Sequence, residues 1–343
     1  MTVAHPALPA DRLTGTPRAH RRTTTAALGL AAAAIALGAV IPTPTAAADL
    51  QPLRILVGFP PGGSADLLAR IIAESARSDF SNIIVENRPG ASGRLAIGLV
   101  KNAKPDGQTV LILPFAPLAI FPHVYKKLEF DPFKDFTPVS LLARFQFGVT
   151  SGPGSNATSI ADMLAKVKAD PRSTTFGTPG EGSAPHFLVG LMSQAAGVPF
   201  THVPFQGGAP ANTALLGGHV GYKVDVVLES AEFHRSGKAR IIGVAGSKRD
   251  PVVPEVPTLK EQGLDVEVSG WFAMIAPAGV APDVLKRLET SIGRAVRQKD
   301  VAEKLGRMGY EPVGSTSAEL AAQQKADYDK WARPIAASGF KLD

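Results

Sequence analysis

The chain has 343 residues, of which 45% are hydrophobic and 19% charged, and it contains no cysteine. This composition excludes a disordered or fibrous protein, and the lack of cysteine excludes disulfides, thiolate metal sites and cysteine nucleophiles. Half of the formal net charge of +6 lies in the first 48 residues, and the other basic residues are dispersed. A nucleic-acid partner is therefore not expected, because phosphate-binding surfaces need clustered basic residues.

The first 48 residues have the pattern of an export signal. Four arginines between residues 12 and 22 precede an apolar run over 26–41, and small residues ending at Ala48 follow. The apolar run is short for a membrane span, so we expect cleavage near Ala48 and a mature protein that is free in the periplasm. The general secretory and the twin-arginine routes both stay open.

The mature chain alternates short apolar runs with helical patterns. Its first part predicts strands at 53–57, 83–85 and 110–113, separated by helices over 65–76 and through Val100. The long crossovers favour a parallel sheet with helices on its faces, which is an α/β architecture. The pattern then restarts, with strands predicted at 147–150, 174–177, 201–203, 224–228 and 241–245 and helices at 160–169, 187–196 and 211–216.

The last part of the chain predicts a strand at 272–275 and then three helices, which begin at Pro282, lie around 301–308 and span 318–332. These helices have no sheet of their own, so we expect them to complete the first domain. The prediction is two α/β domains, 49–147 plus 272–343 and 148–271. The chain crosses between them near 147 and near 271, and two crossings form a hinge. Trp271 and Phe272 are expected to pack at this hinge, with ligand stacking as the alternative.

Four loops at the ends of predicted strands are rich in glycine and proline, and each leads into a helix. They span 58–66, 87–93, 177–186 and 204–210. Open α/β sheets bind ligands at this edge. Glycine lets a ligand approach the backbone, and the free N–H groups at a helix start attract an anion. The loops therefore predict a site for a carboxylate, with a phosphate as the alternative.

Seven segments together carry a family resemblance: Gly58–Asp66, Glu86–Gly93, Lys104–Gly107, Asp131–Val139, Leu215–Val220, Pro254–Thr258 and Ala276–Gly279. They cover the mature chain in order and resemble the Bug family, the extracytoplasmic solute receptors of tripartite tricarboxylate transporters. The resemblance implies a two-domain periplasmic-binding-protein-like fold with the ligand cleft between the domains. It also implies a monomer that captures a small carboxylate-containing organic solute for membrane permease subunits, without catalysis and without a cofactor.

In such receptors, backbone N–H groups and bridging waters from the loops of both domains hold a ligand carboxylate. The resemblance places the site at Phe59, Pro61, Gly62, Gly63, Ser64, Asp66, Ala91 and Phe115 on one side, and at Thr178, Gly182, Ser183, His186, Gly207 and Gly208 on the other. Asp225, at an acidic position near the cleft, is expected to receive a ligand amine or hydroxyl.

Two departures from the family pattern bear on the ligand. Pro114–Pro117 replaces small hydroxyl residues, and Gly221 and Val226 stand where Asp and Asn are commoner. Each buried hydrogen bond contributes about 0.5 to 1.5 kcal/mol. We therefore predict a ligand with fewer polar substituents than citrate, either aromatic or short-chain.

Other classes of function have little support in the sequence. It lacks His-Glu-x-x-His, Gly-x-Ser-x-Gly and a complete phosphate-binding loop, so no metal site, serine hydrolase or nucleotide enzyme is expected. The alternative is a sensory or interaction module of the same fold that signals ligand presence to a membrane partner, since it needs the same cleft and hinge.

Overall fold

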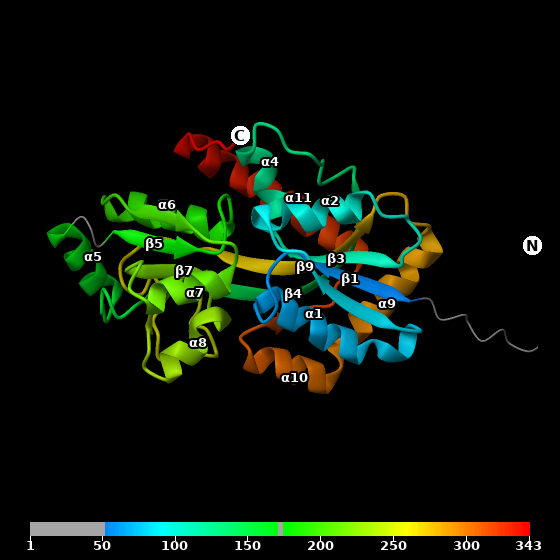
Figure 1. Cartoon of the computed structure of the whole chain (residues 1–343), viewed down its shortest axis with the longest axis horizontal. Helices are drawn as coiled ribbons and strands as arrows, with labels where there is room; N and C mark the ends of the chain where they lie inside the picture. The colour runs from blue at the N-terminus through cyan, green and yellow to red at the C-terminus, as the bar shows by residue number, and fades with distance from the viewer. Residues whose placement is uncertain (1–51, 171–173) are drawn as a thin grey trace, which may run out of the picture. The chain divides into compact units, whose positions relative to one another are not determined.

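The computed structural model describes residues 52–170 and 174–343, so the predicted export signal at 1–48 lies outside the described residues. The described residues form one compact unit. Its main sheet has the strand order β2-β1-β3-β9-β4-β7-β5-β6, with β8 and β10 also paired to β4 (Figure 1). This is the predicted α/β class. No helix within the two described ranges is long and apolar enough to cross a membrane.

One half of the sheet begins with three parallel strands. β1 (Leu53–Val57) pairs with β2 (Ile83–Asn87) on one side and with β3 (Thr109–Pro114) on the other. The crossovers carry α1 (Ser64–Ser75), η1 (Arg77–Asp79), η2 (Ala91–Gly93) and α2 (Arg94–Lys101). α1 and α2 cover opposite faces of these strands, as right-handed crossovers in opposite directions require (Figure 1).

The other half repeats this construction. β5 (Thr175–Thr178) pairs in parallel with β6 (Thr201–Pro204) and with β7 (Tyr222–Val226). The connecting helices are α5 (Ile160–Ala169), α6 (Ala184–Ala196), α7 (Gly208–Leu216) and α8 (Leu228–Arg235), and β8 (Arg240–Val244) follows. Ser159 caps α5 by accepting a hydrogen bond from the backbone of Asp162, as its position before the helix predicted.

Two long antiparallel strands join the halves. β4 (Phe136–Ser151) pairs with β9 (Ser269–Pro277) through its first part and with β7 and β8 through its last part. The sequence predicted only the end of β4, as a strand at 147–150. The strand continues past Pro138 with a bulge, which accommodates a residue without a backbone N–H. The predicted crossings near 147 and 271 lie on these strands, where Phe145 pairs with Gly270. The division into two domains itself stays a prediction.

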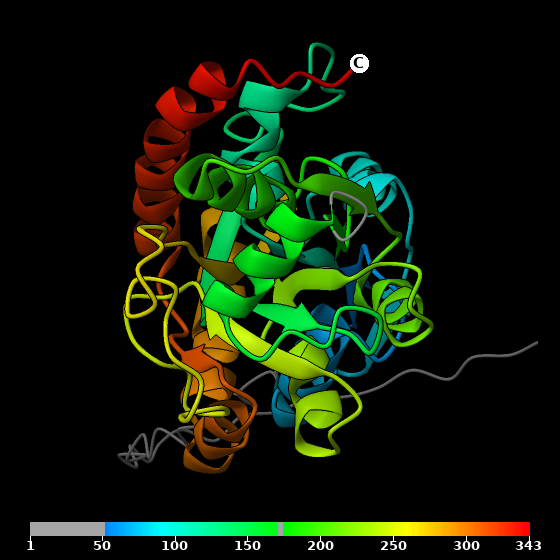
Figure 2. The same cartoon turned by 90° about the vertical axis from the view of Figure 1, so that its left-hand side faces the viewer.

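The C-terminal helices pack against β4, β10, α1 and α3 (Ala116–Ala119). They are α9 (Pro282–Arg297), α10 (Lys299–Arg307) and α11 (Ser317–Ser338), with the short β10 (Glu311–Pro312) pairing with β4. Figure 2 shows α11, in red, running along one side. The Tyr310 hydroxyl donates to the carbonyl of Ser64, which ties this segment to the start of α1. Two short helices, α3 (Ala116–Ala119) and α4 (Phe121–Val124), follow β3 and contact α11.

Candidate functional site

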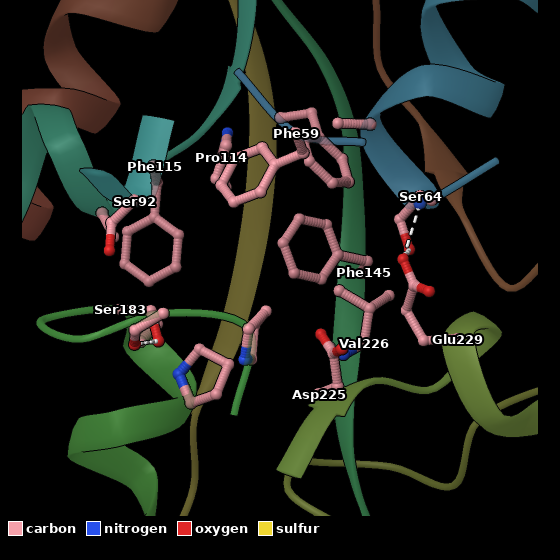
Figure 3. A pocket seen from close by; sticks show the side chains of 18 of the residues that line it. Phe59, Ser64, Ser92, Pro114, Phe115, Phe145, Ser183, Asp225, Val226 and Glu229 are labelled. Carbon is pink, nitrogen blue, oxygen red and sulfur yellow. Dashed lines mark hydrogen bonds between the residues drawn. The ribbon is translucent and has the colours of Figure 1, made fainter. Parts of the chain in front are cut away.

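A cavity of about 70 Å³ lies at the carboxyl ends of the parallel strands (Figure 3). The loops after β1, β3 and β5, together with the end of β7, contribute to its wall. Parallel strands that alternate with helices place their carboxyl ends at one edge of the sheet, which is where open α/β sheets bind ligands. The cavity therefore occupies the position that the loop pattern predicted.

Aromatic rings form much of the cavity wall. Phe145 lies 4.6 Å from Phe272 and 5.3 Å from Phe147 between ring centroids, so the rings of β4 and β9 pack against one another. Phe115 covers another side and contacts Trp271, which does not itself line the cavity. Such a surface binds the apolar part of a ligand through buried contact area.

Six of the predicted site residues line the cavity: Phe59, Gly63, Ser64, Phe115, Ser183 and Asp225. Nine others lie in the loops, strand ends and helix starts around the cavity without lining it: Pro61, Gly62, Asp66, Ala91, Thr178, Gly182, His186, Gly207 and Gly208. The segment Pro114–Pro117 lines it in full, and so does Val226. The apolar replacements singled out in the sequence thus face the cavity, whereas Gly221 does not.

Asp66 supports the loop between β1 and α1. Its carboxylate accepts hydrogen bonds from the backbone of Gly62, from Arg70 and from Asn87, each 2.9 Å long. Burial would raise the pKa of Asp66, but these hydrogen bonds outweigh it and hold the pKa below its usual value. Asn87 also donates to the carbonyl of Phe59. Asp66 therefore acts on the cavity by fixing the loop that carries Phe59 and Ser64.

The loop between β5 and α6 is held by similar internal bonds. Ser183 caps α6 and donates to the carbonyl of Gly180 over 2.6 Å. Gly182 donates its backbone N–H to Nδ1 of His186, and Thr178 hydrogen-bonds Nε2 of His202 at 2.6 Å. The two imidazole rings stack with centroids 3.7 Å apart. These contacts give Thr178, Gly182 and His186 a role in shaping the loop.

Both stacked histidines are neutral at pH 7. Burial lowers the pKa of His186 to about 4, and burial together with the neighbouring His186 lowers that of His202 to about 3. The unfolded chain, with pKa values near 6.5, binds more protons as the pH falls, so the folded state loses stability. We expect the free energy of unfolding to fall by about 3 to 4 kcal/mol between pH 7 and pH 5 through this pair, or about 2 kcal/mol for each histidine.

Urea denaturation at the two pH values measures this loss. His186→Asn keeps an acceptor for Gly182 but does not titrate, so it should reduce the pH dependence. An undiminished pH dependence in His186→Asn would contradict the assignment.

The loops from the two sides of the cavity touch one another. Ser92 donates to the carbonyl of Glu181 over 3.0 Å, and a Cβ added to Gly207 would lie 2.8 Å from Cδ of Pro60. Glu229, in the first turn of α8, accepts hydrogen bonds of 2.6 Å from both the backbone N–H and the hydroxyl of Ser64 (Figure 3). The cavity is thus closed by direct contacts between loops far apart in the sequence.

Sequence reasoning missed several lining residues. Phe145 and Phe147 lie within β4 instead of in a loop, and Glu229 lies one turn after Asp225 at the start of α8. The sequence could have indicated Glu229, because it lies at a helix start directly after the predicted strand at 224–228 and close to Asp225.

A mixed sheet with such a cavity at its strand ends, closed by glycine-rich loops from both sides, is the arrangement of a periplasmic solute-binding protein. MatC from Rhodopseudomonas palustris, solved with bound malate, is similar with a TM-score of 0.78 and 30% identity, covering 83% of this chain and 99% of its own. An R. palustris protein solved with adipate matches with a TM-score of 0.81 and 29% identity, covering 85% and 98%.

The sequence comparisons identify the family. The family model described as the tripartite tricarboxylate transporter family receptor, TctC, matches residues 68–340. Protein BugT from Bordetella pertussis is 30% identical over 295 residues, which are 85% of this chain and 90% of BugT. The chain therefore belongs to the TctC receptor family, as its resemblance to the Bug receptors predicted. It is a solute-binding receptor and not an enzyme.

Proposed function

We propose that the chain captures a small carboxylate-containing organic solute in the periplasm and delivers it to the membrane subunits of a tripartite transporter. In this proposal the export signal is cleaved near Ala48, and the predicted domains 49–147 plus 272–343 and 148–271 close over the ligand. The observation that carries it is the cavity at the strand ends, lined by loops that lead into α1 and α6. Helix starts at such a site favour an anionic ligand.

The aromatic wall supports a ligand with a substantial apolar part. Phe115, Phe145 and Phe272 offer the ligand carbon surface, whereas the polar side chains at the cavity are few. A ligand with three carboxylates would leave charged groups without partners in this wall, and such burial is costly. We infer that aromatic and short-chain mono- or dicarboxylates bind better than citrate.

A thermal-shift screen of the mature chain, residues 49–343, tests this function. Ligand at 100 times its Kd adds about 2.7 kcal/mol to the free energy of unfolding. At roughly 2 to 4 °C per kcal/mol, this amounts to a shift of several degrees. We expect such a shift with one class of aromatic or short-chain carboxylates and a smaller one with citrate.

The amide of each active acid is the control, because it keeps the shape and loses the charge. Folded protein that no carboxylate stabilises, after refolding to remove any co-purified ligand, would contradict the proposed function.

A further inference from the structure

The segment that follows α11 contacts both halves of the molecule. α11 ends at Ser338, and residues 339–343, here called the strap, continue beyond it. Figure 2 shows the strap, in red, leaving the end of α11 and running to the C-terminal label. Its contacts with the first half are made by the backbone, and its contacts with the other half are made by side chains.

Backbone hydrogen bonds tie the strap to the segment after α4. The N–H of Leu342 donates to the carbonyl of Val124 over 2.9 Å, and the N–H of Lys126 donates to the carbonyl of Leu342 over 2.8 Å. Nζ of Lys341 adds a hydrogen bond of 2.6 Å to the carbonyl of His123. Because α4 follows β3 and packs against α11, these bonds anchor the strap on the first half.

Two side chains of the strap reach the other half. The ring of Phe340 meets the imidazole of His186 edge-on, with centroids 4.5 Å apart, and it lies 5.6 Å from the ring of Phe187. Both of these partners belong to α6. Leu342 lies against the loop before α6, since a Cβ added to Gly182 would be 3.1 Å from its Cδ1. Phe340 and Leu342 are half-buried against the main core.

The loop that the strap covers forms a wall of the cavity. Gly180 and Ser183 of this loop line the cavity, whereas the described residues of the strap do not. His186 accepts a hydrogen bond from the backbone of Gly182, so Phe340 packs on the residue that shapes the loop. The strap therefore acts on the cavity only through the loop between β5 and α6.

We propose that the strap is a latch that holds the two halves together over the cavity, with Phe340 and Leu342 as its positioning residues. Opening the cavity requires the loop to leave these side chains, and edge-to-face aromatic contacts stabilise beyond the area they bury. The latch favours the closed arrangement and so slows entry and release of the solute. This inference rests on the proposed function, in which the two predicted domains close over the ligand, and it adds the element that keeps them closed.

Hydrogen exchange of the refolded mature protein, without added solute, measures the hold of the latch on the loop. The amide of Gly182 donates to His186 and that of Phe187 to the carbonyl of Ser183, so both exchange when the loop opens. Phe340→Ala should make peptides covering 178–187 exchange about ten times faster, which corresponds to about 1.4 kcal/mol in the opening equilibrium. Peptides from α9, which packs against α1 and β4, should exchange at an unchanged rate.

Double electron–electron resonance between two spin labels measures whether the halves stay together. The chain has no cysteine, so Lys104→Cys, after α2, and Gln194→Cys, on α6, place the two labels uniquely at exposed positions. In this labelled protein, Phe340→Ala should add a population with longer distances between the labels. Lys330→Ala, at an exposed position of α11, is the matched control and should change neither the exchange nor the distances.

The two measurements decide together. Faster exchange of the loop with longer distances supports the latch. Faster exchange with an unchanged distance distribution overturns it, because the strap then supports the loop alone, and unchanged exchange overturns it as well. If Phe340→Ala fails to fold, as circular dichroism would show, Leu342→Ala decides by the same two measurements. Neither measurement needs a bound solute, so an overturned latch leaves the carboxylate receptor intact, and a carboxylate screen that finds no ligand does not affect the result for the latch.

Discussion

Replacing Trp271 by alanine is expected to lower the free energy of unfolding by about 3 to 5 kcal/mol, the usual range for a large buried aromatic residue. The side chain is 2% exposed, and its ring centroid lies 5.6 Å from that of Phe115. Its indole N–H donates to Oδ2 of Asp327 on α11 over 2.6 Å. The substitution therefore removes apolar contact between β9 and Phe115, which follows β3, and leaves the Asp327 carboxylate with fewer donors.

Urea denaturation measures the effect, with the slope compared between variants to confirm that the same surface unfolds. Trp271→Phe keeps much of the contact area and loses the N–H, so its cost should be about 1 to 2 kcal/mol. Phe133→Ala is the control, because Phe133 is 46% exposed and its loss should cost less than about 1 kcal/mol. A loss below 1 kcal/mol for Trp271→Ala would show that the packing of β9 does not depend on this residue.

The site residues that could be predicted are those whose place in the fold is determined by the local sequence. Phe59, Ser64, Ser183 and Asp225 follow or end short apolar strands, and the α/β pattern brings such strand ends to one edge. The alternation of strands and helices could also be predicted locally, because helices and strands have different hydrophobic periods.

The part that could not be predicted depends on contacts between distant segments. Phe145 lines the cavity from the part of β4 that pairs with β9, and Phe147 lines it from the part that pairs with β7. The local pattern does not reveal this pairing. Thr178 and His186 have residue types that suit ligand binding and loop support equally. Only the position of His202, a separate strand away, shows that they support the loop.

Three glycines near the cavity, Gly62, Gly182 and Gly208, differ in the effect that a substitution would have. Gly62 and Gly182 have positive φ angles of 82° and 71°, so any side chain there strains the backbone. A Cβ on Gly62 would meet nothing within 4 Å, and one on Gly182 would face Leu342 and Tyr125. Bulky residues at these two positions would therefore act on binding through the loop backbone. Gly208 gives the more specific test, because its Cβ would point at the carboxylates of Asp225 and Glu229.

Gly208→Ala is accordingly expected to weaken binding of the tightest carboxylate found in the thermal-shift screen by about 30-fold, or about 2 kcal/mol. The new Cβ would lie 2.6 Å from Oε2 of Glu229 and 2.8 Å from Oδ2 of Asp225. Asp225 is fixed within β7, so Glu229 must move, and its hydrogen bonds to Ser64 across the cavity are lost. Titration calorimetry measures the change in affinity.

Gly190→Ala provides the matched control, since this glycine lies inside α6 and a Cβ there would meet nothing within 4 Å. It should leave affinity unchanged and raise stability by about 0.5 to 1 kcal/mol through helix propensity. If Gly208→Ala binds the ligand as tightly as the unsubstituted chain, ligand affinity depends neither on the positions of the Asp225 and Glu229 carboxylates nor on the contact between Glu229 and Ser64. If Gly208→Ala alone loses affinity and its free energy of unfolding is unchanged, the contact between Glu229 of α8 and Ser64 of α1 contributes to ligand binding.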